Sequence, residues 1–197
     1  MSSKYVVGMV LAGGAGRRLS PDKGRHLVGG IPIIDRVLAA LTPVVDDIII
    51  VGHGPPPPGL RLLADEQPGA GPLAAIYTGM SAAPADVYLV VAWDMPFLTS
   101  DLLRYLLGAG QGFDAAVPVV GGQEQPLCAA YGRSCLAAIG EAVAAGQRRV
   151  ISFFSEVQVR RITEAELKAC GAPEVLLFNV NTAQELAAAE QMVGDSE

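Results

Sequence analysis

A glycine-rich segment near the start of the chain combines residue types that bind phosphate. Gly13, Gly14 and Gly16 directly follow an apolar run, and Arg18 and Lys23 come shortly after them. Glycine lets the backbone take positive φ and approach a ligand, and successive N–H groups can line an anion site. Arginine offers phosphate a fixed fork of donors, and lysine offers a mobile charge. Because the chain has only three lysines, the place of Lys23 favours phosphate binding over a solvated turn.

The spacing departs from the two most common phosphate-binding loops. A Walker A loop requires Gly-x-x-x-x-Gly-Lys-Ser/Thr, but Asp22 directly precedes Lys23. The dinucleotide fingerprint Gly-x-Gly-x-x-Gly would use Gly14 and Gly16, but Leu19 stands where its last glycine belongs. The segment therefore predicts a phosphate site of another type.

Two aspartates are candidate partners for that site. Asp94 lies just past the apolar run 87–92. A carboxylate there suits Mg²⁺, which keeps several waters and takes further ligands from phosphate oxygens. Asp65 stands in the turn-rich stretch 65–73. Since aspartate is also common in turns, the residues alone leave a purely structural role open for both.

Composition and charge exclude several classes of protein. The chain is 51% hydrophobic and 17% charged, with a net charge of −6, which predicts a substantial core and argues against a bulk nucleic-acid binder. No apolar run is long enough to span a bilayer, and the first residues lack the layout of a signal peptide. The cysteines, Cys128, Cys135 and Cys170, lie far apart without metal-binding spacing. We therefore expect a cytoplasmic protein with no nucleic-acid or membrane partner.

Predicted strands and helices alternate along the chain. The strands are expected at 5–12, 47–51, 61–64, 87–92, 115–119, 158–162 and 175–178. The helices are expected at 33–41, at 72–82, from 99 or 100, at 134–145, after a Thr163-x-x-Glu166 capping box, and from 182. This order predicts one α/β domain over residues 1–197, with 194–197 frayed: a doubly wound, mostly parallel sheet with helices on both faces. In such folds ligands bind at the carboxyl ends of strands.

Several segments, in order along nearly the whole chain, together resemble the molybdenum cofactor guanylyltransferases (MobA), a family of nucleotidyltransferases of Rossmann-like fold. The first loop and the last block are the most specific. The segments are Gly13-Gly14 with Asp22-Lys23-Gly24, the acidic residue and Pro-Gly-x-x-Gly-Pro-Leu at 65–73, the segments 91–98, 125–129 and 146–150, and Phe178-Asn179-Val180-Asn181-Thr182.

The resemblance implies Mg²⁺-dependent transfer of GMP from GTP to the phosphate of molybdopterin or molybdenum cofactor, with release of pyrophosphate. It also implies a role for each matching residue. Arg18, Lys23 and Asp94 would be catalytic; Leu11, Ala12, Gly13, Gly14, Lys23, Asp65 and Asp94 would bind nucleotide; Asn179 and Asn181 would bind the pterin substrate; and Asp94 would hold the metal. Molybdoenzyme maturation proteins are candidate partners.

Several positions depart from the family pattern, and in the first loop Leu19 and Ser20 stand where the family usually has methionine and glycine. Trp93 replaces a small residue beside Asp94, Ala75 stands where glycine is frequent, and His53 occupies a loop that commonly carries asparagine. Two alternatives stay open: a related cytidylyl- or sugar-phosphate nucleotidyltransferase, and a catalytically idle nucleotide-binding regulator of cofactor delivery. The Asp-Lys-Gly triplet favours guanine, because cytidylyl relatives more often lack it. Helix capping is an alternative role for either asparagine of the last block.

Overall fold

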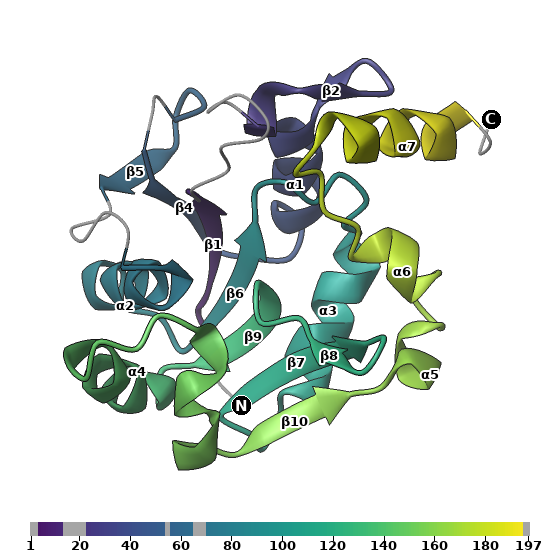
Figure 1. Cartoon of the computed structure of the whole chain (residues 1–197). Coiled ribbons are helices and arrows are strands. Elements are labelled where there is room, and N and C mark those ends of the chain that lie inside the picture. The colour runs from purple at the N-terminus through teal and green to yellow at the C-terminus, as the bar shows by residue number, and fades with distance from the viewer. Residues whose placement is uncertain (1–3, 14–22, 54–55, 65–69, 195–197) are drawn as a thin grey trace.

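The computed structural model describes residues 4–13, 23–53, 56–64 and 70–194. Within them, a mixed sheet has the strand order β10-β7-β9-β6-β1-β4-β5, with β8 beside β7 (Figure 1). Its strands are β1 (Val6–Ala12), β4 (Asp47–Gly52), β5 (Arg61–Ala64), β6 (Val87–Ala92), β7 (Ala115–Val120), β8 (Gln123–Glu124), β9 (Cys128–Gly132) and β10 (Val159–Ile162). A separate ribbon pairs β2 (Leu27–Val28) with β3 (Ile31–Pro32).

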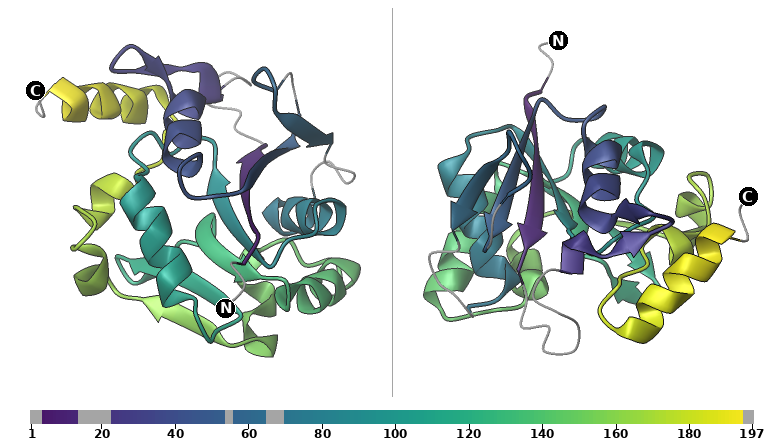
Figure 2. Two further views of the ribbon diagram at one scale, coloured as in Figure 1. Left: turned by 180° about the vertical axis from the view of Figure 1, so that it is seen from behind. Right: turned by 90° about the horizontal axis from the view of Figure 1, so that it is seen from above.

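Helices cover both faces of the sheet, as the alternating pattern predicted (Figure 2). They are α1 (Ile33–Leu41), α2 (Pro72–Ala82), α3 (Ser100–Ala109), α4 (Cys135–Ala144), α5 (Glu164–Leu167), α6 (Pro173–Leu176) and α7 (Ala183–Gly194), with 3-10 turns η1 (Lys23–Arg25) and η2 (Val150–Glu156). Successive side chains of a strand point to opposite faces. Accordingly, Val10 joins the core beneath α1 and α3, whereas Met9 joins the core beneath α2 and α4.

The centre of the sheet is parallel and buried on both faces. β1 pairs in parallel with β4 on one side and β6 on the other, so Val10 lies opposite both Ile50 and Val91. These strands are nearly continuous runs of apolar residues, which is typical of strands covered by helices on both faces. Their carboxyl ends therefore lie together at one edge.

Strand β9 makes the sheet mixed, because it runs antiparallel between β6 and β7. The prediction of a strand at 175–178 is wrong: this stretch contains the end of α6 and the turn that follows. Pro173 occupies the first turn of α6, where its fixed φ and missing N–H are tolerated. A four-residue apolar run carries too little periodicity to separate strand from helix.

Two predicted helix starts are confirmed by their caps. Thr99 Oγ1 accepts a hydrogen bond from the N–H of Leu102 at 3.2 Å, and Thr163 with Glu166 forms the expected capping box. Residues 195–197, most of the predicted frayed tail, lie outside the described residues. Among the helices described, none combines the length and the apolar character needed to cross a bilayer.

Candidate functional site

Backbone hydrogen bonds join the loops that follow the three central strands. The N–H of Trp93, just after β6, donates to the carbonyl of Leu11 at 3.3 Å. The N–H of His53, just after β4, donates to the carbonyl of Ala12 at 3.2 Å. Leu11 and Ala12 are buried, whereas Gly13 is exposed. The predicted nucleotide-binding residues at the end of β1 thus lie between the ends of its two neighbours.

Gly52 permits this close approach at the end of β4. It has a φ of 152°, and a methyl group on its Cα would lie 1.9 Å from the carbonyl oxygen of Ala12. No other residue fits there without separating the two strands. Gly52 is not among the residues that the sequence predicts for the site, and its only signal there is a glycine at the end of a β-branched run.

The segment that contains both predicted substrate asparagines lies against Asp94. The carbonyl oxygen of Asp94 accepts a hydrogen bond from the N–H of Val180 at 2.9 Å, and Asp94 is half-buried. Residues 179–181, far from Asp94 in the sequence, therefore border the carboxyl edge of β6. The structure brings these three predicted site residues into one region.

A threonine accepts the N-terminal hydrogen bond of α7. Thr182 Oγ1 accepts from the N–H of Glu185 at 3.2 Å, and the Glu185 carboxylate accepts from the N–H of Asn181 at 2.7 Å. The side-chain amide of Asn179 donates to the carbonyl of Leu177 at 3.0 Å. Because Thr182 accepts the N-terminal hydrogen bond of α7, helix capping does not account for the presence of Asn179.

The described part of the glycine–lysine segment also reaches this edge. Lys23 begins η1, and Gly24 is buried against Trp93 and Ile34. A methyl group on Gly24 would lie 2.7 Å from Cε3 of Trp93 and 3.4 Å from Cβ of Ile34. The backbone of η1 therefore packs directly on the residue that precedes Asp94. The predicted site residues Gly14, Arg18 and Asp65 lie outside the described residues.

The beginning of α2 contacts the turn at 146–150. Gly71, with a φ of 92°, precedes α2, and a methyl group on it would lie 2.9 Å from the carbonyl oxygen of Arg148. The predicted substrate-side segment is joined to β6 as well, because the N–H of Ala92 donates to the carbonyl of Leu127 at 2.9 Å. Ala75 is buried within α2. The segment 125–129 is thus adjacent to the end of β6, and the segment 146–150 is adjacent to the start of α2.

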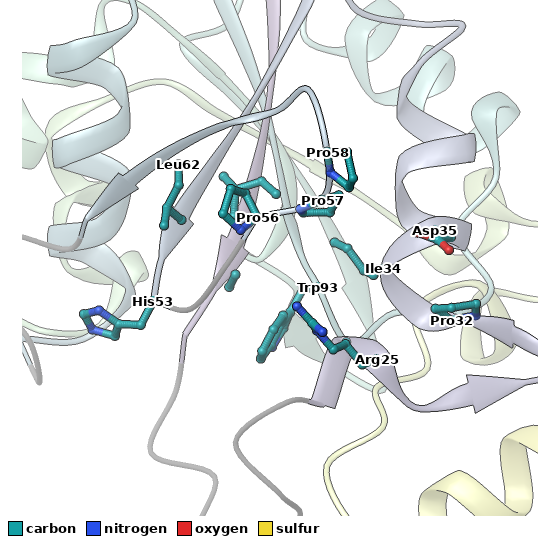
Figure 3. Close-up of a pocket in the computed structure, with 13 residues that line it drawn as sticks. Arg25, Pro32, Ile34, Asp35, His53, Pro56, Pro57, Pro58, Leu62 and Trp93 are labelled. Carbon is teal, nitrogen blue, oxygen red and sulfur yellow. The ribbon is translucent and has the colours of Figure 1, made fainter.

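A cavity of about 360 Å³ lies beside the end of β1, on the α1 face of the sheet (Figure 3). Trp93, Arg25 and His53 line it, and the Arg25 side chain lies next to the Trp93 ring (Figure 3). Residues 56–58, three prolines, form part of its wall. Proline fixes the backbone and donates no hydrogen bond, so this wall is stiff and apolar. In the sequence, this run of prolines indicates a stiff connector and gives no signal of a cavity wall.

The described residues offer no nucleophilic cysteine at this edge. Cys128 lies opposite Val91 in the β6–β9 pair and is buried, and burial raises the pKa of its thiol to about 12. A thiol with that pKa is almost entirely protonated at neutral pH and is a poor nucleophile. No three or more histidine, cysteine, aspartate or glutamate side chains of the described residues gather into a metal-binding group.

Known proteins with similar sequences match nearly the whole chain. A probable molybdenum cofactor guanylyltransferase from Pelotomaculum thermopropionicum is 39% identical over 192 residues, which cover 96% of this chain and 94% of the relative. A molybdenum cofactor guanylyltransferase from Cereibacter sphaeroides is 33% identical over 195 residues, covering 94% and 96%.

Two solved structures illustrate that the fold is shared with known proteins. The molybdopterin-guanine dinucleotide biosynthesis protein A of Archaeoglobus fulgidus matches with a TM-score of 0.81 at 24% identity, over 96% of this chain and 99% of that one. The 2-C-methyl-D-erythritol 4-phosphate cytidylyltransferase of Thermus thermophilus matches with a TM-score of 0.70 at 20% identity, over 94% and 98%. The model of the MobA-like NTP transferase domain matches residues 8–162. With a family match over most of its length and close relatives along nearly all of it, the chain belongs to the MobA-like NTP transferases and is a nucleotidyltransferase.

Proposed function

We propose that this protein transfers GMP from GTP to the terminal phosphate of molybdopterin or its molybdenum form and releases pyrophosphate. The observation that carries the proposal is the meeting of the Leu11–Gly13 backbone, η1, Asp94 and the 179–181 segment at one edge of the sheet. Ligands of parallel α/β sheets bind at this edge. The relatives that match nearly the whole chain are named molybdenum cofactor guanylyltransferase or probable molybdenum cofactor guanylyltransferase.

The reaction needs no general base. An oxygen of the substrate phosphate is already anionic and attacks the α-phosphorus of GTP, forming one P–O bond. The bond from the α-phosphorus to the bridging oxygen breaks, and pyrophosphate leaves with the electron pair. Catalysis then consists of alignment and of charge neutralisation on the leaving group. We assign that neutralisation to Lys23 and Arg18, and the binding and alignment of the nucleotide to Leu11, Ala12, Gly13, Gly14 and Asp65.

Asp94 fits the role of a Mg²⁺ ligand by its chemistry. It is one carboxylate at the carboxyl edge, and Mg²⁺ commonly takes one or two carboxylates together with phosphate oxygens and water. When bound, Mg²⁺ would supply positive charge next to the phosphates. The carbonyl of Asp94 is held by Val180, so the residue that carries the carboxylate also fixes the position of the asparagine segment. We propose that Asn179 and Asn181 face the pterin substrate from that segment.

We also propose that residues 1–197 act as one cytoplasmic domain, with molybdoenzyme maturation proteins as candidate partners. Cys128, Cys135 and Cys170 are all free thiols, which fits a reducing compartment. One domain should unfold in a single transition by circular dichroism and by fluorescence. Two separated transitions would contradict this assignment.

A nucleotide panel tests the function. GTP, CTP, ATP and UTP are each incubated with Mg²⁺, pterin substrate and enzyme, and pyrophosphate release is measured. We expect release with GTP, and we expect GTP to raise the melting temperature most, because a ligand that binds only the native state stabilises it. A larger shift with CTP contradicts the guanylyl assignment. Nucleotide binding without any pyrophosphate release would favour the idle regulator.

A further inference from the structure

Trp93 occupies a junction between the candidate metal ligand and the candidate phosphate-binding segment. It is the only tryptophan of the chain. It directly precedes Asp94, it is half-buried, and its N–H donates to the carbonyl of Leu11 at 3.3 Å. The backbone at Trp93 is thus tied to β1, and the indole is the part that extends away from this junction.

The indole ring lies on Gly24. A methyl group on Gly24 would be 2.7 Å from Cε3 and 3.2 Å from Cδ2 of Trp93. Gly24 is not among the described glycines with positive φ, so its backbone conformation does not require glycine. The absent side chain instead leaves room for the large ring. Trp93 and Gly24 are therefore a matched pair, one large and one without a side chain, and Gly24 adjoins Lys23 in η1.

The same ring borders the cavity of about 360 Å³ that Arg25 and His53 also line (Figure 3). A side chain at the wall of an open cavity can be shortened without opening a new void in a closed core. The energetic loss on truncation is therefore expected to be smaller than for a fully enclosed aromatic side chain. This makes substitutions of Trp93 usable as tests of function.

We propose that Trp93 is a positioning residue that holds η1, and with it Lys23, in place relative to Asp94. The proposal rests on the proposed function, which gives Lys23 and Asp94 their roles. The Trp93 ring contacts Gly24 of η1, and the Trp93 backbone is hydrogen-bonded to Leu11 at the end of β1. Together these contacts fix the distance between η1 and the loop after β6, which carries Asp94, before any ligand binds. Preorganised charges favour catalysis, because less ordering is needed when the triphosphate arrives.

A double-mutant cycle tests whether Trp93 acts through the lysine. The variants are Trp93→Ala, Trp93→Phe, Lys23→Ala and Trp93→Ala with Lys23→Ala. We expect Trp93→Ala to lower kcat/KM about tenfold and Trp93→Phe to stay near the wild type. The double variant should match Lys23→Ala alone within about twofold, because residues that act as one unit are not additive. Losses that multiply would overturn the proposal, and so would unchanged activity of Trp93→Ala.

A size exchange checks the contact itself. Gly24→Ala should weaken GTP binding in the wild type because its methyl group would collide with the ring. In the Trp93→Ala background the same change should have little further effect. Gly108→Ala is the matched control, since a methyl group there meets nothing within 4 Å. Equal losses from Gly24→Ala in both backgrounds would contradict the pairing of the two residues.

Tryptophan fluorescence separates positioning from direct stacking on a base. Because Trp93 is the only tryptophan, its emission reports this junction alone. We expect inorganic tripolyphosphate, which has no base, to change the emission nearly as much as GTP does, and Lys23→Ala to abolish the response. A response to GTP but not to tripolyphosphate would show that the ring stacks on guanine, which overturns the proposal. If the emission responds to both ligands but no GMP is transferred, the proposed function fails while the role of Trp93 stands.

Discussion

The two edges of the sheet use aspartate in different ways. Asp46, Asp86 and Asp114 directly precede β4, β6 and β7, at the amino edge. The Asp46 carboxylate accepts from the N–H of Val6 at 2.7 Å, and that of Asp86 accepts from the N–H of Tyr5 at 2.8 Å. Asp94 follows β6, at the carboxyl edge, and its carbonyl oxygen accepts a hydrogen bond from the N–H of Val180 at 2.9 Å.

Asp114 shows what the amino-edge arrangement does energetically. Its carboxylate accepts from Ser134 Oγ at 2.5 Å and from the N–H of Gln158 at 2.9 Å. The hydroxyl of Ser134, and then the N–H of Gln158, hold the pKa of Asp114 below its usual value. A carboxylate of this kind stabilises the chain through its own protein partners. Strand-end aspartates of one sheet thus serve structure at one edge and, in the proposed function, chemistry at the other.

The largest expected effect is that of Asp94→Asn, with Asp86→Asn as its counterpart at the amino edge. Asparagine keeps the shape but removes the charge, so turnover should fall on the order of a thousandfold and the Mg²⁺ midpoint should rise. Binding of GTP alone should change little. Pyrophosphate release measured over a Mg²⁺ titration gives both quantities. A normal midpoint and turnover for Asp94→Asn would move the metal site to Asp65 and end the contrast between the edges.

The next largest effect is a loss of stability, which should differ between two glycines at strand ends. Gly52→Ala should lower the free energy of unfolding by more than about 3 kcal/mol, because the methyl group would lie 1.9 Å from a carbonyl of β1. Gly132→Ala, at the end of β9, should cost less than about 1 kcal/mol, since its nearest neighbour would be 3.2 Å away. Urea unfolding measures both. Similar losses for the two variants would mean that β1 and β4 separate easily.

Lys23→Ala should lower turnover about a hundredfold while the protein stays folded. The expected reason is the loss of a positive charge that stabilises the leaving pyrophosphate. Lys168→Ala, at an exposed lysine after α5, is the matched control and should keep wild-type turnover. Steady-state kinetics with GTP and circular dichroism measure the two properties. Equal activity of both variants would make Lys23 an ordinary solvated side chain.

The smallest effect is expected at Asp114. Asp114→Asn should lower the free energy of unfolding by only about 1 kcal/mol at pH 7. The effect is small because the carboxylate is partly exposed, and solvent weakens its interactions. The folded pKa of Asp114 lies below its unfolded value, so its contribution is present above the unfolded pKa of about 4 and is lost as pH falls through the folded pKa. Urea unfolding of both proteins at pH 7 and pH 3 should show the difference shrinking. A difference that grew on acidification would have the wrong sign for a stabilised carboxylate.

Local patterns were sufficient for most of the elements. The apolar runs of β1, β4 and β6, the caps at Thr99 and Thr163, and the spacing in α1 follow from short-range chemistry that each segment carries by itself. The alternation of these elements predicted helices on both faces of one sheet, as observed. The strand predicted at 175–178 failed because four apolar residues after a proline fit a helical turn equally well.

The order of residue types was enough to identify which residues could carry the chemistry: a glycine-rich segment followed by one of the three lysines of the chain, Asp94 after a buried strand, and a separate asparagine block. The folded arrangement was needed to reveal that Val180 binds the backbone of Asp94, that β9 enters the sheet antiparallel, and that Trp93 covers Gly24. These contacts join residues far apart in the chain, and their energy depends on how whole elements pack. Local propensity contains no information about such neighbours, because the same indole or glycine is equally acceptable in many other surroundings.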